Sequence, residues 1–438
     1  MNKTQYEPNI DFLRGISIIL VTIYHLKIEI FNIKLLPGGY LGVDIFFVIS
    51  GYLITSILYI NLKKNKFSLK EFFIRRFTRI FPVYIFVIVI TSILAFFLLV
   101  PNQLYDLAKS SIYSLIFVSN IFFWRSLNNY YNPDAIFDPL LHTWSLGIEI
   151  QFYLFFSILF IFLFKFTNKL KFSLFLIGII SLILSISLSY IEPQINFFGF
   201  QSRLWEFLLG SFVFFYKDNF KINLSKFLKY GIYFLIIIFA ILFNENTKHP
   251  SFLTLFLLIL VSIIIIDKSN YKLNFFDKIL LFFGLISYSL YLWHYPILSL
   301  SERIFFNQTY EIKIFLILVS ILLSYLSFNL LERKLKKNLK STILFSFSLL
   351  SISLLIIYLF LSSSGYPNRL AQSNFFKINT KDLNYSHNYN NVEFNKKILI
   401  LGNSHSVQTY QGFTLNHEIY KNYDFQNFHI QISCIEEE

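Results

Sequence analysis

Long apolar runs recur from one end of this 438-residue chain to the other, and they restrict its fold more than any other feature. A helix of about 20 apolar residues crosses the hydrocarbon core of a bilayer. Charged residues make up only 14% of the chain, whereas a soluble domain carries about 25%. Soluble, disordered and fibrous folds are therefore excluded. The sequence predicts an all-α polytopic membrane bundle of about eleven transmembrane helices, at residues 10–27, 40–60, 80–100, 146–164, 172–190, 203–216, 230–243, 251–267, 279–300, 313–331 and 341–361.

Basic residues alternate between successive loops, and this alternation orients the predicted helices. Twenty-two Lys and Arg lie in five loops, which are 61–79, 165–171, 217–229, 268–278 and 332–340. The loops between them hold only five. Cytoplasmic loops collect Lys and Arg, so we expect a cytoplasmic N-terminus and an extracytoplasmic segment 362–438. The alternation requires that a weaker apolar run, 111–124, does not cross the membrane alone.

Composition also limits the partners and cofactors. The formal net charge is +13, but residues 362–438 contain six basic and seven acidic residues, so the surplus belongs to the membrane part. We therefore expect a lipid bilayer around the chain and no nucleic-acid partner. The single cysteine, Cys434, excludes a disulfide framework and a cysteine-based zinc or iron–sulfur site. No metal is expected.

The first apolar run contains two residues that can be ionised. Arg14 and His25 are eleven positions apart, so they share a helix face within roughly 20° and lie about 16 Å apart along the axis. With a cytoplasmic N-terminus, His25 lies toward the outer half of the membrane. Such residues are costly in hydrocarbon and indicate function. The alternative is that the two residues lie at opposite ends of the helix and that each side chain extends to the nearer membrane surface.

More polar residues fall at the same outer depth as His25. Each of them taken alone could be an ordinary polar residue at the membrane surface. Together, acids and bases at one depth favour a lined cavity with proton-transfer chemistry. The residues predicted to surround this cavity are Asp44, His142, Glu149, Arg203, Glu206 and His294.

Three arginines follow one another on the side predicted to be cytoplasmic. Arg75 and Arg79 are separated by four positions, and Arg76 and Arg79 by three, so a helix would present them as neighbours. Guanidinium groups bind phosphates with two parallel hydrogen bonds. The pattern favours a phosphate-binding face, although the general excess of basic residues in cytoplasmic loops would also explain it.

These segments resemble the successive motifs of the acyltransferase-3 family over about residues 6–335, in the order in which the family has them. The motifs are Ile10–Gly15 with His25, Gly39–Ile54, Arg75–Pro82, His142–Glu149 with Gln151–Tyr153, Arg203–Glu206 and Ser287–Pro296. Two positions depart from the family pattern. Ile150 stands where a second Glu is common, and no Pro follows Glu332.

The resemblance implies an enzyme of the bacterial inner membrane. Such an enzyme moves an acyl group, usually acetyl, from cytoplasmic acyl-CoA to a hydroxyl of a cell-surface carbohydrate such as lipopolysaccharide O-antigen or peptidoglycan. Arg14 and His25 would be the essential catalytic pair, and we add Glu149 and His142 to the predicted catalytic residues. Arg75, Arg76 and Arg79 would bind the acetyl-CoA donor, while Asp44, Arg203, Glu206 and His294 would line the substrate cavity.

The resemblance also divides the chain. Residues 1–340 would form the ten-helix acyltransferase domain, and 341–361 an additional helix. Residues 362–395 read as a linker, because Ser362–Gly365 and an Asn/Tyr-rich stretch lack apolar periodicity.

Residues 396–438 resemble the start of an SGNH hydrolase domain. A strand expected at Lys397–Leu401 precedes Gly402-Asn403-Ser404, and the family places its nucleophilic serine at such a turn. The family's Asp-x-x-His motif does not follow, so we expect an incomplete α/β segment with a second strand near Phe428–Cys434. Ser404 is then expected to be inert, because it lacks a base.

Two other functions stay open from the sequence. A polysaccharide or glycolipid transporter also needs many spans and a polar site at mid-membrane, but it would be expected to contain inverted repeats and broken helices, which are not evident here. A non-catalytic relic would explain an incomplete tail.

Overall fold

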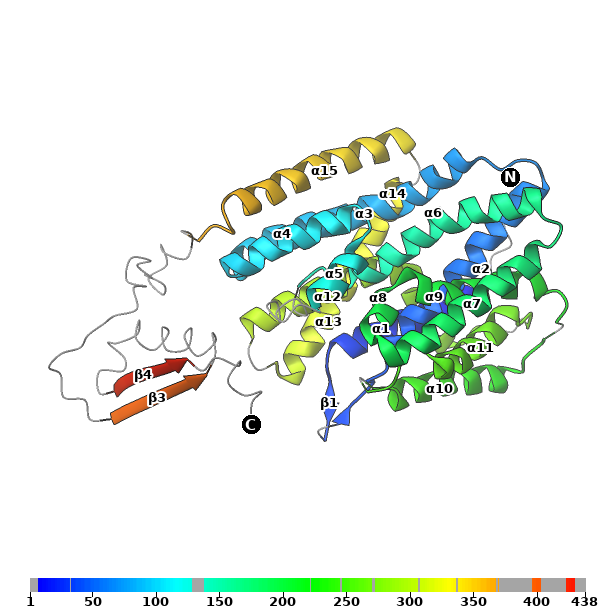
Figure 1. Ribbon diagram of the computed structural model, residues 1–438. Coiled ribbons are helices and arrows are strands. Elements are labelled where there is room, and N and C mark those ends of the chain that lie inside the picture. Colours follow the sequence, from blue (N-terminus) through cyan, green and yellow to red (C-terminus); the bar gives the residue numbers. More distant parts are fainter. Residues whose placement is uncertain are drawn as a thin grey trace. The chain divides into compact units, whose positions relative to one another are not determined.

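The computed structural model describes residues 7–429 except 32, 128–137, 221, 245, 270–271, 306–307, 336–337, 368, 370–395 and 403–422. The chain divides into two compact units, Met1–Gly365 and Tyr366–Glu438. The first unit is a bundle of helices, and the second contains a short pair of strands (Figure 1). Ser404 and most of the expected linker lie outside the described residues.

The helices of the first unit follow one another along the chain with short connections (Figure 1). They are α1 Pro8–His25, α2 Leu41–Lys63, α3 Leu69–Leu98, α4 Pro101–Leu115, α5 Ser119–Leu127, α6 Thr143–Phe166, α7 Leu170–Ile191, α8 Pro193–Phe198, α9 Phe200–Tyr216, α10 Lys226–Leu242, α11 Phe252–Ile266, α12 Phe275–Ile304, α13 Tyr310–Ser327, the π-helix η2 Phe328–Glu332, α14 Arg333–Leu335 and α15 Leu339–Ser362. A small antiparallel hairpin, β1 Glu29–Ile30 and β2 Ile33–Lys34, lies between α1 and α2.

Seven of the described helices, not eleven, are long and apolar enough to span a membrane, and they fit a multi-pass membrane protein. They are α2, α3, α6, α7, α12, α13 and α15. The four other expected spans are also helices, but α9 and α10 have 17 residues, α11 has 15, and α1 carries Asp11 and Arg14. A 15-residue helix is only about 22 Å long. The expected count of eleven spans is therefore not confirmed.

The apolar run 111–124 does not form one helix. α4 ends at Leu115 and α5 begins at Ser119, with Phe117 between them in the left-handed backbone region at φ 57°. A bulky residue with positive φ is strained outside a turn. The break divides the run into two pieces that are each too short to cross a bilayer.

Two glycines let α1 and α12 approach each other closely. A Cβ atom at Gly15 would lie 2.2 Å from the carbonyl oxygen of Leu280, and one at Gly284 would lie 2.0 Å from that of Asp11. No side chain fits in these gaps. Small residues at helix crossings are a common way to bring membrane helices into backbone contact, and here they fix the helix that carries Arg14 and His25 against α12.

A second glycine crossing joins α2 to α9. A Cβ at Gly51 would lie 1.9 Å from Phe207 O, and one at Gly210 would lie 2.0 Å from Val48 O. This contact sets the depth of Asp44 on α2 relative to the polar residues near the start of α9. The two crossings thus hold four of the helices that carry predicted site residues.

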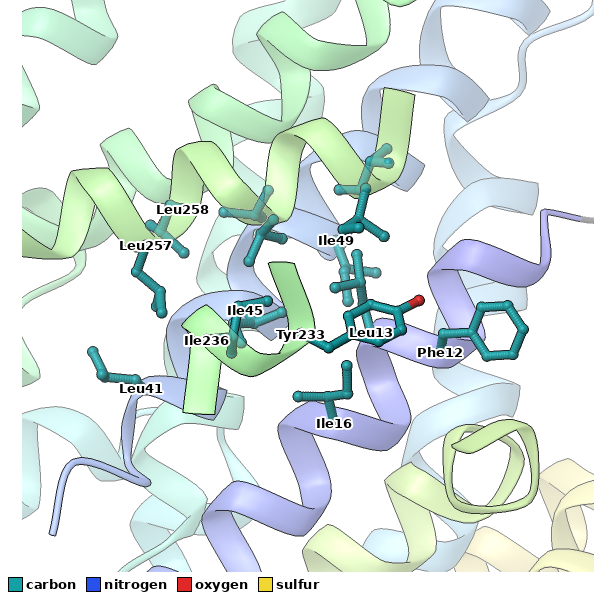
Figure 2. Packing of buried hydrophobic residues seen from close by; sticks show 14 of the residues in the cluster. Phe12, Leu13, Ile16, Leu41, Ile45, Ile49, Tyr233, Ile236, Leu257 and Leu258 are labelled. Carbon is teal, nitrogen blue, oxygen red and sulfur yellow. The ribbon is translucent and has the colours of Figure 1, made fainter. Parts of the chain in front are cut away.

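The largest described hydrophobic cluster lies among α1, α2, α10 and α11, as Figure 2 shows. Leu13 and Ile16 of α1 meet Ile45 of α2, and Ile236 and Leu257 close the other side. All five side chains are buried. Close packing of these apolar side chains holds the four helices together in the interior of the bundle.

The second unit contains β3 Lys396–Gly402 and β4 Tyr423–His429, which pair in parallel. The strand expected at Lys397–Leu401 is present. The second strand begins at Tyr423, five residues before the expected Phe428. Parallel neighbours need a crossover connection, and residues 403–422 between them lie outside the described part.

The α2–α9 crossing can be tested with one added methyl group. Gly51→Ala places a Cβ into the backbone of α9, so we expect a loss of about 1–3 kcal/mol of stability from overpacking. Thermal unfolding of the purified protein in detergent measures it. Gly231→Ala on α10 is the matched control, because nothing lies within 4 Å of its Cβ position, and it should be neutral or slightly stabilising. Equal effects from both substitutions would contradict the close crossing.

Candidate functional site

Three histidines from three helices meet at one end of the bundle. His25 ends α1, His142 precedes α6, and His294 lies in α12. The ring centroids of His25 and His294 are 5.3 Å apart, and those of His142 and His294 are 5.8 Å apart. Tyr295 closes the group, with its ring 4.8 Å from that of His25 and 5.4 Å from that of His142. The structure therefore brings together three histidines that are far apart in sequence.

Two of these imidazoles are buried with ring nitrogens that lack a hydrogen-bond partner of ordinary geometry among the described residues. His294 Nδ1 bonds the Leu290 carbonyl at 3.0 Å, but its Nε2 has no partner. His142 is buried, and neither of its nitrogens has one. Buried polar atoms are nearly always paired. The His142 ring interacts with the backbone of Pro139 and Leu292, so His294 Nε2 is the nitrogen of this pair that has the weakest contacts among the described residues.

A cavity of about 380 Å³ opens beside the histidines. His25, His142 and Tyr295 line it, together with residues of the β1–β2 hairpin and the aromatic side chains Tyr24, Tyr40, Trp144, Phe197, Phe198 and Tyr291. His294 lies behind this lining, in contact with both of the other imidazoles. A concave site with aromatic walls and a few convergent polar groups is typical of small-molecule binding.

Asp44, Arg203 and Glu206 meet in a fully buried ion cluster next to the cavity. Arg203 Nη1 donates to Asp44 Oδ1 at 2.6 Å and to Glu206 Oε1 at 3.0 Å. His249 joins them from the loop between α10 and α11, with its Nε2 3.2 Å from Arg203 Nη1 and 3.3 Å from Asp44 Oδ1. Burial lowers the pKa of His249, and the neighbouring Asp44 carboxylate opposes this shift.

The ion cluster supports the cavity wall and is not part of its lining. The Arg203 guanidinium lies over the rings of Trp144 and Phe197, 5.6 and 5.1 Å from their centroids. Arg203 Nε also donates to the Phe197 carbonyl at 3.0 Å. Both rings line the cavity. The structure thus joins three of the four residues predicted to line the cavity, but it places them, like His294, one layer behind the surface.

The arginines predicted to bind phosphate do not share one environment. Arg75 is exposed and pairs with Glu71 at 2.6 Å. Arg76 and Arg79 are half-buried, and both lie within electrostatic range of Arg14. Arg76 Nε is buried without a partner among the described residues. The inward face of α3 therefore presents Arg76 and Arg79, while Arg75 lies on the other side.

Arg14 lies with these arginines and away from the histidines. Its Nη1 donates to Asp11 Oδ1 at 3.1 Å, one turn earlier on α1. Three guanidinium groups from two helices lie near two carboxylates, Asp11 and Glu149, and leave this end of the site positive. Such a concentration of charge attracts an anion.

A column of polar side chains on α6 joins the two ends of the site. Ser145, Glu149 and Tyr153 are four residues apart and share one helix face. Ser145 Oγ bonds Tyr291 in the cavity wall at 2.5 Å. Glu149 Oε1 accepts hydrogen bonds from Ser50 Oγ at 2.5 Å and from Tyr153. Tyr153 and Glu149 are within electrostatic range of Arg76, so the column reaches the arginine group.

Comparison with known proteins identifies the family of this chain. A family model described as an acyltransferase domain, acyltransferase-3, matches residues 7–360. The chain belongs to the acyltransferase-3 family. It is 35% identical over 363 residues to the O-acetyltransferase OatA of Staphylococcus aureus strain COL, which covers 77% of this chain and 58% of that protein.

A putative O-acetyltransferase, SAS0844 of Staphylococcus aureus strain MSSA476, is 32% identical over 361 residues. The aligned region includes 76% of this acyltransferase-3 chain and 58% of the relative, so the chain again spans little more than half of the relative's length. No solved structure matches. The family resemblance expected from the motifs is confirmed, and the match extends through most of α15.

Sequence reasoning missed four residues of the site. Tyr291 and Tyr295 lie within the Ser287–Pro296 motif, so that motif was a signal for them. His249 and Asp138 lie in loops outside the quoted motifs. Within the described residues, no group of three or more His, Cys, Asp and Glu could hold a metal ion.

Asp138 lies four residues before His142, in the turn that leads into α6. Its Oδ1 accepts a hydrogen bond from the Leu140 amide at 2.8 Å. Burial raises the pKa of this carboxyl to about 7, although hydrogen bonds from Ser110 and Leu140 act in the opposite direction. The carboxyl is also within electrostatic range of Tyr295 in the cavity wall. A raised pKa in the folded state makes stability depend on pH.

We expect the free energy of unfolding to fall as the pH rises from about 4 to 7. In the unfolded chain the Asp138 carboxyl loses its proton at a pH of about 3.9, whereas in the folded protein it keeps the proton up to about pH 7, so the unfolded state gains stability over this range. Asp138→Asn should flatten this dependence. Thermal unfolding midpoints across this pH range measure the effect. Asp218→Asn, which removes a surface partner of Lys268, should keep the wild-type slope. The same slope in the Asp138→Asn protein would exclude this carboxyl as the cause.

Proposed function

We propose that the protein is a membrane O-acyltransferase that transfers an acyl group, acetyl in the simplest case, from acyl-CoA to a hydroxyl of a cell-surface carbohydrate. The observation that carries this proposal is the polar column on α6. It joins a group of arginines with too few carboxylates to a cavity that contains buried imidazoles. One end suits the anionic part of the donor and the other suits the hydroxyl to be acylated.

Arg76 and Arg79 would bind the phosphates of the donor. Guanidinium groups hold phosphate oxygens by charge-assisted hydrogen bonds, and the unpartnered Nε of Arg76 fits such a ligand. Arg14, on the facing helix, would add a third positive charge. Arg75 pairs with Glu71 on the exposed side, so we assign it no contact with the donor, in contrast to the sequence prediction.

His25 would act as the general base of the transfer. A sugar hydroxyl attacks the thioester carbonyl poorly until its proton is removed, and histidine is suited to accept a proton near neutral pH. The hydroxyl oxygen forms the new ester bond, the carbon–sulfur bond breaks, and the proton passes from His25 to the leaving CoA thiolate. His142 and His294 would orient the His25 ring, and Glu149 would hold Tyr153 and Ser50 in the column.

The acceptor would enter the cavity of about 380 Å³. Aromatic side chains such as Trp144 and Tyr40 offer flat apolar faces with polar edges, which suit the faces of a sugar ring. A glycan of the cell surface, such as lipopolysaccharide O-antigen or peptidoglycan, fits this site if the histidine end faces outward. The basic loops at the arginine end support a cytoplasmic N-terminus in the inner membrane.

The strand pair of the second unit supports one further part of the proposal. β3 ends at Gly402, directly before Asn403 and Ser404, and it pairs in parallel with β4. Parallel strands belong to α/β folds. We assign this segment to an SGNH-like domain outside the membrane.

The donor site can be tested by comparing neighbouring arginines. Arg76→Gln and Arg79→Gln should each raise the KM for acyl-CoA by about tenfold or more, because each removes a charge-assisted hydrogen bond worth about 1.5–3 kcal/mol. Arg75→Gln is the matched control and should leave this KM within about twofold. Radiolabelled acetyl-CoA and a glycan acceptor in detergent provide the assay. A larger effect at Arg75 than at Arg76 would reverse the assignment.

Removal of the base tests the chemistry itself. His25→Ala should reduce the transfer rate by about 10²–10⁴-fold, and Arg14→Ala should also abolish measurable transfer. Both proteins should reach the membrane in normal amounts with unchanged thermal midpoints. Because a transporter would form no ester in detergent, this assay also separates the two functions. Wild-type transfer by either variant would remove that residue from the mechanism.

A further inference from the structure

An open pocket of about 640 Å³ lies at the end of the bundle opposite the histidines. It is built where α2 ends at Lys63, α6 ends at Phe166, α7 begins at Leu170 and α9 ends at Tyr216. His142 stands at the other end of α6. None of the arginines or α6 column residues described above lines the pocket either, so the proposed reaction does not use it. Its lining consists of Tyr59, Phe164, Thr167, Asn168, Lys169, Leu170, Lys171, Phe172, Phe175, Phe212, Phe215 and Tyr216.

The pocket is positively charged. Lys169 and Lys171 line it, and no acidic residue does. A third cation, Lys63, lies over the ring of Tyr59, with Nζ 5.9 Å from the centroid. In the part of the chain that the structure describes, none of these three lysines forms an ion pair with a carboxylate. Four other lysines at this end, Lys217, Lys226, Lys229 and Lys268, have acidic partners. The unpaired lysines leave a positive site that an anion can fill.

Aromatic rings hold one of these lysines in place. Lys171 Nζ lies 5.1 Å from the centroid of Tyr216 and 5.5 Å from that of Phe215. A cation near aromatic faces is attracted to them and keeps its hydrogens available to a second partner. The amide of Asn168 belongs to the same lining, whereas the Thr167 hydroxyl donates to the Leu163 carbonyl at 2.9 Å. A phosphate group would find cations and hydrogen-bond donors together.

One wall of the pocket continues into the lipid-facing surface. Phe172 and Phe175 of α7 line the pocket and are exposed, Phe172 at 61%. Only 22% of the apolar window of α7 is buried in the protein. A small soluble anion would make no favourable contact with these phenylalanine side chains. A molecule with a phosphate and a hydrocarbon chain would contact both the lysines and the phenylalanines.

We propose that this pocket binds an anionic phospholipid from the adjacent leaflet. Its phosphate lies between Lys169 and Lys171, and an acyl chain lies along Phe172 and Phe175. A lipid with a quaternary ammonium headgroup would place a positive charge near Lys169 and Lys171, and no Asp or Glu lines the pocket to pair with it. The site therefore prefers a lipid whose headgroup has a net negative charge, such as phosphoglycerol. Basic pockets between membrane helices recognise lipid headgroups through this combination. The proposal stands apart from the transfer reaction and is tested without it.

The test uses the purified full-length protein after removal of its native lipid. Phosphatidylglycerol and phosphatidylcholine with the same acyl chains are titrated separately, and native mass spectrometry measures the bound fraction. We expect phosphatidylglycerol to bind more tightly. The double variant Lys169→Gln/Lys171→Gln should weaken this binding about 25-fold, since a lysine near an anionic lipid surface contributes about fivefold. Lys171→Arg keeps the charge and should keep the preference.

Lys64→Gln/Lys66→Gln is the matched control. It removes the same charge from the same end of the bundle, on exposed residues outside the pocket lining. Excess glycerol 3-phosphate should displace no lipid, because it lacks the acyl chain. Equal binding of the two lipids, an equal loss in the control, or displacement by glycerol 3-phosphate would each overturn the proposal. Thermal midpoints without lipid verify that the variants are folded.

Discussion

The direct backbone contact between α1 and α12 is the constraint on which the rest of the site depends. Gly15 and Gly284 let the two helices meet without an intervening side chain. Gly15 follows Arg14, so the contact fixes the direction in which the Arg14 side chain leaves α1. At the other end of α1, His25 then lies opposite His294 of α12. Any larger residue at either glycine would separate the helices. The imidazole pair would lose its geometry even if all three histidines were present.

Buried charge is handled in two different ways in this protein. In the Arg203 group, opposite charges meet and nearby rings cover the guanidinium, although Asp44 Oδ2 and Glu206 Oε2 are buried without a hydrogen-bond partner among the described residues. Removal of one partner from such a group typically costs 3–5 kcal/mol. Arg76 Nε is also buried without a partner, and within the described residues neither Arg76 nor Arg79 forms an ion pair with a carboxylate. The first group therefore balances its charges by ion pairs, whereas the second does not.

The sequence predicted the helical bundle because apolar runs and basic loops carry their signal locally. The first helix, expected at 10–27, forms at 8–25, and the Lys397–Leu401 strand is present. Other features depend on tertiary contacts that no local pattern shows. The environment of Arg75 is set by Glu71 and by the rotation of α3, and His249 meets Asp44 only through the folding of the α10–α11 loop. The roles of the site residues stay predictions.

The cavity has two walls of different mechanical character. One is formed by the His25 end of α1 and by α12, whose main chains touch farther along the helices, at Gly15 and Gly284. The other comes from the hairpin after α1 and from the start of α6, where aromatic rings pack on one another through rotatable side chains. A bulky substrate can widen the entrance only where the side chains of this second wall rotate. Selectivity among acceptors should therefore diverge first at Tyr40, Phe197 and Phe198, and the imidazoles should tolerate little change.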